Sequence, residues 1–231
     1  MYAPQFHRTV RLMGEGALRR LSRVHVMVFG LGGVGSAAAE ALVRAGVGKL
    51  TLVDCDVVDV TNLNRQLIAL HSTVGRPKAE AAAARYRDIN PDCALTVRND
   101  RYTADNRDAF FDVPCDYILD AIDSVADKID LIVTAQERGI PLISAMGTGN
   151  KLDPGRLQVT DLAKTEVCPL ARVMRRELRR RGITHQKVVF STEPPRKSED
   201  GERTPASSPW VPAAAGLLMA AEAVRDLTGA W

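Results

Sequence analysis

The sequence predicts an α/β protein with a doubly wound, mostly parallel sheet. Three observations favour it: short β-rich apolar runs alternate with helical patterns, a glycine-rich turn joins the first run to an alanine-rich helix, and the second run ends in an acid. This pattern is Rossmann-like. Because 231 residues suffice for one such domain with a large core, we expect a single domain over 1–231. It divides into an N-terminal arm (1–23), a core (24–150) and a C-terminal extension (151–231).

The expected parallel strands are five apolar runs, at 24–29, 49–54, 94–98, 116–120 and 141–145. The expected helices between them cover 34–45, 78–88 and 124–138. The first of these has small residues that allow close packing on the sheet. The second begins after Pro77, and the third has Ser124 as its expected N-cap.

After Gly147 the pattern changes, and runs at 156–161 and 187–193 are expected to extend the sheet in a mixed or antiparallel manner. The remaining expected elements are a basic helix (169–182), a mobile loop (194–209) and a final helix (211–227). The loop holds almost no side chain suited to burial. Pro212 suits a first helical turn, and we expect the final helix to be buried or dimer-facing.

No apolar stretch reaches the roughly 18–20 residues of a membrane span, and the N-terminus lacks the pattern of a signal peptide. We therefore expect a cytoplasmic protein. Its four cysteines, Cys55, Cys93, Cys115 and Cys168, form no C-x-x-C pair, which predicts reduced thiols and no zinc site. The net charge of +3 is too small to indicate a polyanion partner by itself, because steering depends on where charges cluster.

The glycine-rich turn predicts a nucleotide site. It runs from Gly30 to Gly35, and its glycines let the backbone approach a phosphate at a helix N-terminus. Asp54 follows about 20 residues later, where an acid binds a ribose hydroxyl. These features alone favour a nicotinamide or flavin enzyme. The glycines expected at the nucleotide are Gly30, Gly32, Gly33 and Gly35.

The segment after Asp54 favours ATP instead. Its polar residues are Asp56, Asn62, Arg65, Gln66 and Lys78. Two cations and an amide beside a phosphate-binding turn can neutralise charge that develops during phosphoryl displacement, a task that hydride transfer does not require. Asp56 has an alternative role as a cap of the turn.

Two acids follow the fourth strand. Asp123 lies just beyond its carboxyl end, where one carboxylate together with phosphate oxygens can bind Mg²⁺. Asp120 is either part of the same site or a structural acid.

Five motifs resemble the ubiquitin-activating-enzyme-like adenylating superfamily, which includes the ThiF, MoeB and HesA groups. They are GLGGVGS (30–36), VDCDVVDVTNLNRQ (53–66), VGRPKAE (74–80), INPD (89–92) and LDAIDS (119–124). The resemblance covers residues 8 to about 150 and implies transfer of AMP from ATP to a carboxylate. It assigns Asp54 to the ribose, Asn62, Arg65 and Lys78 to the phosphates and Asp123 to magnesium. It also implies a homodimer in which Arg11, or else Arg8, enters the partner's ATP site, so the implied catalytic set is Arg11, Arg65, Lys78 and Asp123.

The C-terminal third is similar to the tRNA threonylcarbamoyladenosine dehydratases, in VTDLAKTEVCPLARVMRRELRRRGI (159–183), VVFSTEPP (188–195) and VPAAAGLLMAAEAVRDL (211–227). The resemblance implies cyclisation of a modified adenosine at position 37 of tRNA. The threonyl carboxylate attacks the α-phosphate of ATP, and the carbamoyl group then expels AMP. Ring closure within one substrate needs no protein nucleophile, since tethering supplies an effective molarity of about 10⁵ M or more.

The helix expected at 169–182 carries a basic cluster opposed only by Glu177. Spacings of three and four place Arg172, Arg175, Arg176 and Arg179 on one face, which predicts contacts to tRNA phosphates. The alternative is a solvated charged face.

Two other functions remain open. One is an adenylyltransferase for a sulfur-carrier protein that ends in Gly-Gly, with Cys168 as a nucleophile. The missing C-x-x-C pairs count against it. The other is a nucleotide-binding interaction module without turnover, for which loss of Arg65 or Lys78 is expected, yet both are present. Sulfur-transfer proteins are a separate candidate partner of the enzyme.

Overall fold

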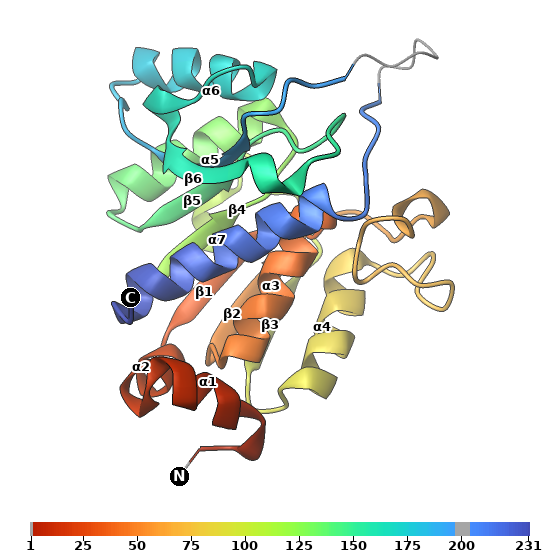
Figure 1. Ribbon diagram of the computed structural model, residues 1–231, viewed down its shortest axis with the longest axis vertical. Helices are drawn as coiled ribbons and strands as arrows, with labels where there is room; N and C mark the ends of the chain where they lie inside the picture. The colour runs from red at the N-terminus through yellow and green to blue at the C-terminus, as the bar shows by residue number, and fades with distance from the viewer. Residues whose placement is uncertain (1, 197–203) are drawn as a thin grey trace.

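The computed structural model describes residues 2–196 and 204–231, in which one seven-stranded sheet has the order β3-β2-β1-β4-β5-β7-β6 (Figure 1). The strands are β1 (His25–Phe29), β2 (Lys49–Val53), β3 (Ala94–Arg98), β4 (Tyr117–Asp120), β5 (Leu142–Ala145), β6 (Leu157–Asp161) and β7 (Lys187–Ser191). The α-helices are α1 (His7–Met13), α2 (Glu15–Leu21), α3 (Gly33–Ala45), α4 (Lys78–Ile89), α5 (Val125–Glu137), α6 (Pro169–Arg180) and α7 (Val211–Thr228). Short 3₁₀ turns occur at Pro4–Phe6, Val60–Asn62, Arg107–Phe110, Pro154–Arg156 and Leu162–Lys164.

The predicted fold class is confirmed. Strands β1 to β5 pair in parallel, β7 adds in parallel to β5, and β6 closes the sheet by antiparallel pairing with β7. Strand β1 lies between β2 and β4, so the strand order reverses at its carboxyl end. In doubly wound sheets a ligand binds at this switch point.

The sheet separates two apolar layers. Along β1, Val26 and Val28 face a core shared with α3, α4 and α7, whereas Met27 and Phe29 face a core shared with α5 and α6. This alternation is the two-residue period of a strand. Each face is covered by helices, which explains why the strands read as continuous apolar runs.

Helix α7 packs closely on α3. A Cβ atom at Gly216 would lie 2.2 Å from the carbonyl oxygen of Val34, so only glycine permits this crossing. The predicted small-residue packing of α3 is therefore confirmed, although the partner is a helix as well as the sheet. Leu217 points away from the contact and is exposed.

The N-terminal arm folds into α1 and α2 at the amino-terminal edge of the sheet, where Gly48 N donates to Leu21 O at 2.9 Å (Figure 1). No helix among the described residues is long and apolar enough to cross a bilayer. Ser124 occupies the N-cap position of α5, but its hydroxyl makes no capping bond, contrary to expectation. In the expected mobile loop, residues 197–203 lie outside the described residues.

Candidate active site

A cavity of about 640 Å³ opens at the carboxyl ends of β1, β2 and β4, within the size range of small-ligand sites. It brings together most residues expected at a nucleotide. Those that line it are Gly30, Gly32, Gly33, Asp54, Asp56, Asn62, Arg65, Gln66, Lys78 and Asp123. Arg11 and Gly35 do not line it. Arg11 is exposed on α1, at the opposite edge of the sheet.

The turn between β1 and α3 requires glycine. Gly30 has a φ of 84°, and a Cβ there would lie 2.6 Å from Ala121 O. A Cβ at Gly35 would lie 1.7 Å from Gly30 O, so Gly35 serves the tight turn rather than the cavity wall. With the backbone this close, the N-terminus of α3 is open to an anion.

Asp54 is oriented by the backbone. Its carboxylate accepts hydrogen bonds from Leu31 N at 2.6 Å and Asp56 N at 2.9 Å. Burial raises the pKa of the Asp54 carboxyl, against the lowering effect of the nearby Lys78 ammonium. The two bonds hold the carboxylate at the end of β2, the position at which a doubly wound fold binds ribose.

Lys78 begins α4 and is buried beside the turn. Its Nζ pairs with the exposed carboxylate of Asp56 at 2.7 Å. The role of Asp56 is therefore to hold Lys78, while its backbone N–H, not its side chain, closes the turn after β2. Because Asp56 is 63% exposed, Lys78 can exchange this partner for a phosphate at little desolvation cost.

The three remaining polar residues come from the segment after β2. Asn62 is buried and forms a capping box with Asp59, whose N–H donates to Asn62 Oδ1 at 3.1 Å. Half-buried Arg65 donates from Nη1 to Thr61 O and Asn64 Oδ1. Gln66 is buried, and its Oε1 has no hydrogen-bond partner in the described structure. An unpaired buried acceptor indicates that a donor is supplied by a ligand or water.

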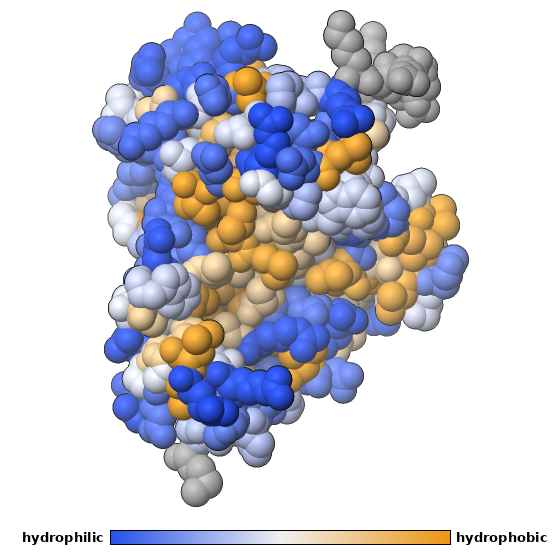
Figure 2. Space-filling view, viewed as in Figure 1, coloured by the Kyte–Doolittle hydropathy of each residue, from blue (hydrophilic) through white to orange (hydrophobic). Residues whose placement is uncertain are grey.

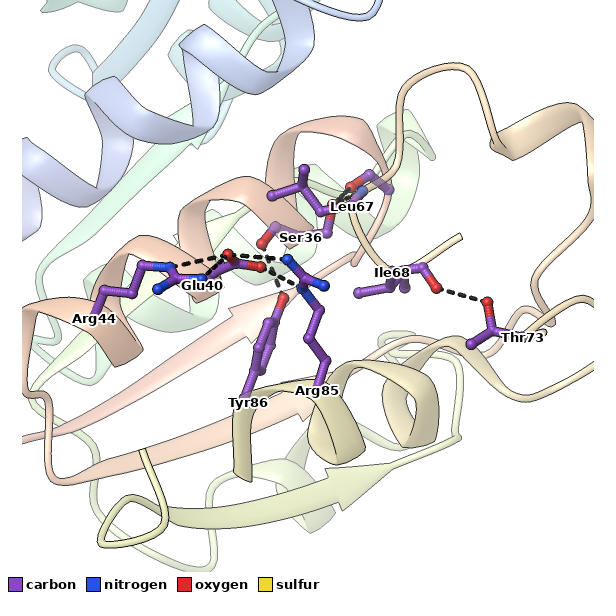
Figure 3. A network of polar contacts seen from close by, with 9 residues as sticks. Ser36, Glu40, Arg44, Leu67, Ile68, Thr73, Arg85 and Tyr86 are labelled. Atoms are coloured by element: carbon purple, nitrogen blue, oxygen red, sulfur yellow. Dashed lines mark hydrogen bonds and ion pairs between the residues drawn. The ribbon is translucent and has the colours of Figure 1, made fainter. Parts of the chain in front are cut away.

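A polar network ties this segment to the glycine turn (Figure 3). Ser36 Oγ donates to Gly32 O at 2.6 Å and accepts from Leu67 N, and Ser36 O accepts from the hydroxyl of Tyr86 on α4. Glu40 pairs with Arg85 and Arg44. Burial alone would raise the pKa of the Glu40 carboxyl, but the hydrogen bonds from the two arginines outweigh it and lower the pKa. Turn, segment and α4 are thus held as one unit.

Sequence reasoning missed the pair on the other side of the cavity. Arg101 follows β3 and pairs with the buried Asp127 of α5 at 2.7 Å, beside Tyr102. Arg101 lies three residues beyond the carboxyl end of a parallel strand, which is a usable signal. Asp123 is exposed nearby and forms no ion pair with any described residue.

Asp120 is structural. Its side chain is fully buried and pairs with Lys128 Nζ at 2.8 Å, and Ser144 Oγ donates to the same carboxylate oxygen at 2.7 Å. The cysteines offer no reactive thiol. Cys168 is 3% exposed, and burial together with the charges of Asp56 and Asp54 raises the pKa of Cys55.

The basic helix is α6, and its arginines differ in their bonding. Arg172, Arg175, Arg176, Arg179 and Arg180 line one shallow groove. Arg175 donates to Thr165 O, Thr165 Oγ1 and Leu162 O, while Glu177 pairs with Arg176, Arg180 and Arg181. Arg172 and Arg179 form no ion pair within the described residues. These two therefore have the guanidinium groups most available to phosphates.

A family model described as the ThiF family matches residues 3–230. The chain belongs to the ThiF family. This ThiF-family chain is 44% identical to the tRNA threonylcarbamoyladenosine dehydratase of Bacillus subtilis, over 96% of the chain and 94% of that protein. It is 41% identical to the Escherichia coli enzyme TcdA solved with AMP, with a TM-score of 0.92 over 97% and 94% of the two chains. The same enzyme solved with ATP matches with a TM-score of 0.91, at 42% identity and equal coverage.

A more distant ThiF-family relative has another printed function. It is the molybdopterin-synthase adenylyltransferase of Salmonella typhimurium, 35% identical over 71% of the chain and 65% of that protein. The dehydratase of Bacillus subtilis therefore matches at higher identity and over more of the chain than this adenylyltransferase.

Proposed function

We propose that the protein is an ATP-dependent tRNA threonylcarbamoyladenosine dehydratase. The observation that carries the proposal is the match to the dehydratases over nearly the whole of both chains, including the C-terminal third. Relatives with that name are solved with AMP and ATP, and the cavity at the β1/β4 switch point has the polar groups that such a nucleotide needs.

The nucleotide lies along the cavity in a defined direction. Its phosphates bind the turn at Gly30–Gly33 and the N-terminus of α3, and Asp54 accepts the ribose hydroxyls. The base then extends beyond β2 toward Arg101 and Tyr102. Asp123 fits Mg²⁺, since its carboxylate is exposed in the cavity and the ion needs only one or two carboxylates beside phosphate oxygens.

In the first step a carboxylate oxygen of the substrate attacks the α-phosphorus, and the bond to pyrophosphate breaks. Lys78 and Arg65, with the amide of Asn62, neutralise the charge on the phosphoryl oxygens and the leaving group. The Lys78 side chain is already oriented for this role, because Asp56 holds its ammonium group beside the turn.

In the second step the carbamoyl group of the same side chain attacks the acyl carbon, AMP leaves, and the proton passes to water. Overall the tRNA side chain loses the elements of one water molecule, and these are taken up when ATP is cleaved to AMP and pyrophosphate. No protein nucleophile takes part, in agreement with the buried Cys168 and with the raised pKa of Cys55.

The tRNA contacts α6 through Arg172 and Arg179, and Arg175 and Arg176 contribute less because their guanidinium groups bond within the chain. A homodimer supplies Arg11 to the partner's site. Arg11 is exposed at the edge of the sheet remote from its own cavity, which supports a role in another copy rather than in its own site.

The surface that suits a second copy is an apolar band. Figure 2 shows it running over α7 and onto the segment after β2. The exposed apolar residues of these two elements include Leu217 on α7 and, in the segment, Val57, Val60, Leu67, Leu70 and Val74. Apolar patches of this kind mark protein interfaces. A sulfur-transfer partner stays a prediction from the resemblance.

The test is pyrophosphate release from ATP with tRNA that carries threonylcarbamoyladenosine, compared with the same tRNA lacking it. We expect release, and formation of the cyclic nucleoside, only with the modified tRNA. Equal rates with both tRNAs contradict the proposal. Stimulation by a Gly-Gly carrier protein alone supports the adenylyltransferase function instead.

A further inference from the structure

We propose that Asn150 is a positioning residue that fixes the acyl-substrate side of the cavity. It does so by holding the segment 204–210, here called the strap, in place as part of the cavity wall. The inference rests on the proposed function, because the substrate it concerns is the threonylcarbamoyl group of the tRNA.

Asn150 bonds to two chain segments that are ten residues apart. Its N–H donates to Ala206 O at 2.7 Å, and its side-chain Oδ1 accepts from Ala206 N at 2.8 Å. Its carbonyl oxygen accepts from Arg196 N at 2.8 Å. The backbone of Ala206 is thus bonded by one residue at both its donor and its acceptor.

The conformation of Asn150 makes this possible. Its φ is 59°, a left-handed value that asparagine tolerates better than most residues. The turn directs the main-chain N–H and the side-chain carbonyl of Asn150 to the same neighbour. Glycine at this position would keep the left-handed backbone and the N–H bond to Ala206 O, but it would lose the side-chain acceptor for Ala206 N.

The strap forms part of the cavity wall. Thr204, Pro205 and Ser207 line the cavity, together with Thr148 and Gly149 just before Asn150. A Cβ at Gly149 would lie 2.7 Å from Pro205, so strap and turn are in close contact. The strap is also attached outside the cavity, where Trp210 Nε1 donates to Leu152 O at 2.7 Å.

Sheet order assigns this wall to the acyl group. Asp54 marks the ribose on β2, and the phosphates follow at the β1 turn, so the nucleotide occupies the β2 side of the switch point. Arg65 and Lys78, which take the leaving pyrophosphate, come from that same side. Because attacking and leaving oxygens are roughly in line, the carboxylate enters from the β4 and β5 side. Thr148 and Gly149 follow β5, and the strap lies against them.

The experiment compares three variants with the wild type. Asn150→Gly keeps the left-handed backbone and removes the Oδ1 acceptor, whereas Asn150→Asp keeps an acceptor at the same place. Trp210→Phe removes a strap bond of equal length outside the cavity. Pyrophosphate release gives KM for modified tRNA, and calorimetry with ATP alone gives the nucleotide affinity.

We expect Asn150→Gly to raise KM for modified tRNA about tenfold, as loss of about 1.4 kcal/mol of positioning implies, with ATP affinity within twofold of wild type. Asn150→Asp is expected to restore most of the loss, and Trp210→Phe to leave KM nearly unchanged. An unchanged KM in Asn150→Gly, or an equal loss of ATP affinity, overturns the proposal. An equal rise of KM in Trp210→Phe also overturns the proposal, because Asn150 would then only help to hold the strap, as Trp210 does, and would have no specific positioning role. A wild type that modified tRNA does not stimulate refutes the proposed function itself.

Discussion

The two sides of the cavity are built differently. On the nucleotide side, two functional groups are held by bonds between residues close in sequence: Asp54 accepts from the N–H of Asp56, and Asn62 accepts from that of Asp59. On the acyl side, the wall depends on contacts between distant segments, such as Asn150 with Ala206. The comparison shows a site in which ATP meets a largely preformed surface while the substrate side depends on the tertiary fold.

The largest expected effect comes from breaking the nucleotide side. Lys78→Ala should lower the rate of pyrophosphate release by about 10²–10³, because it removes a charge that stabilises the displaced phosphoryl groups. Single-turnover measurements with saturating modified tRNA would give this rate. Arg19→Ala is the control, since Arg19 is exposed on α2 and, among the described residues, forms an ion pair only with Glu15. A rate within twofold of wild type in Lys78→Ala would remove Lys78 from the reaction.

A second prediction breaks the contact between α7 and α3, the helix that begins at the glycine turn. Gly216→Ala places a Cβ 2.2 Å from Val34 O and 2.9 Å from Ala38 N, so α7 must shift away from α3. We expect the free energy of unfolding to fall by about 1–3 kcal/mol, and ATP affinity to fall with it. Denaturant titration measures the free energy of unfolding. In Gly16→Ala on α2, the nearest atom to the added Cβ is the flexible Arg20 Nη1 at 3.8 Å, so the same change should instead stabilise by about 0.5–1 kcal/mol.

A third prediction concerns the surface beyond the acyl side. Arg172→Ala combined with Arg179→Ala should weaken tRNA binding at low salt and reduce the slope of log K against log salt by about 2. Arg180→Ala, which removes a residue already paired with Glu177, should change the slope less. The measurement is tRNA binding at several salt concentrations. An equal slope in the wild type, the double variant and Arg180→Ala contradicts a phosphate contact by α6.

The smallest expected effect is a dependence of the protein's stability on pH, through His25 of β1 in the sheet beneath both sides of the cavity. Burial lowers the pKa of His25, whose Nδ1 bonds Pro114 O and whose Nε2 contacts Thr51 Oγ1. The folded state then binds fewer protons than the unfolded chain, so stability should fall as the pH drops below about 6.5. Unfolding midpoints at pH 7.5 and 5.5 should differ less in His25→Gln. An equal difference in both proteins would exclude His25 as a source.

The fold and the nucleotide side were predictable because their signals are local. The glycine turn, the acid after β2, and Asn62, Arg65 and Lys78 lie within 50 residues of sequence, and the sheet forms them into one wall. Periodicity predicted both ends of the seven strands to within one residue, except the carboxyl end of β7, which lies two residues earlier than expected.

The acyl side was not predictable for the opposite reason. No pattern near Asn150 indicates that its partner is Ala206. At the base end of the nucleotide side, the pairing of Arg101 with Asp127 was not predictable either, because it depends on how the segment after β3 meets α5. The arginines of α6 were found by spacing. Their unequal bonding was not, since Arg175 turns toward Thr165 only in the folded chain.

The contact between α7 and the glycine turn has a consequence for synthesis of the protein. A Cβ at Gly33 would lie 2.9 Å from Pro212, so the start of α7 forms one side of the phosphate-binding turn. The ribosome makes α3 long before α7. A nascent chain therefore carries a complete glycine motif before the cavity is complete, and under the proposed function we expect ATP to stabilise the protein fully only after α7 has emerged and packed.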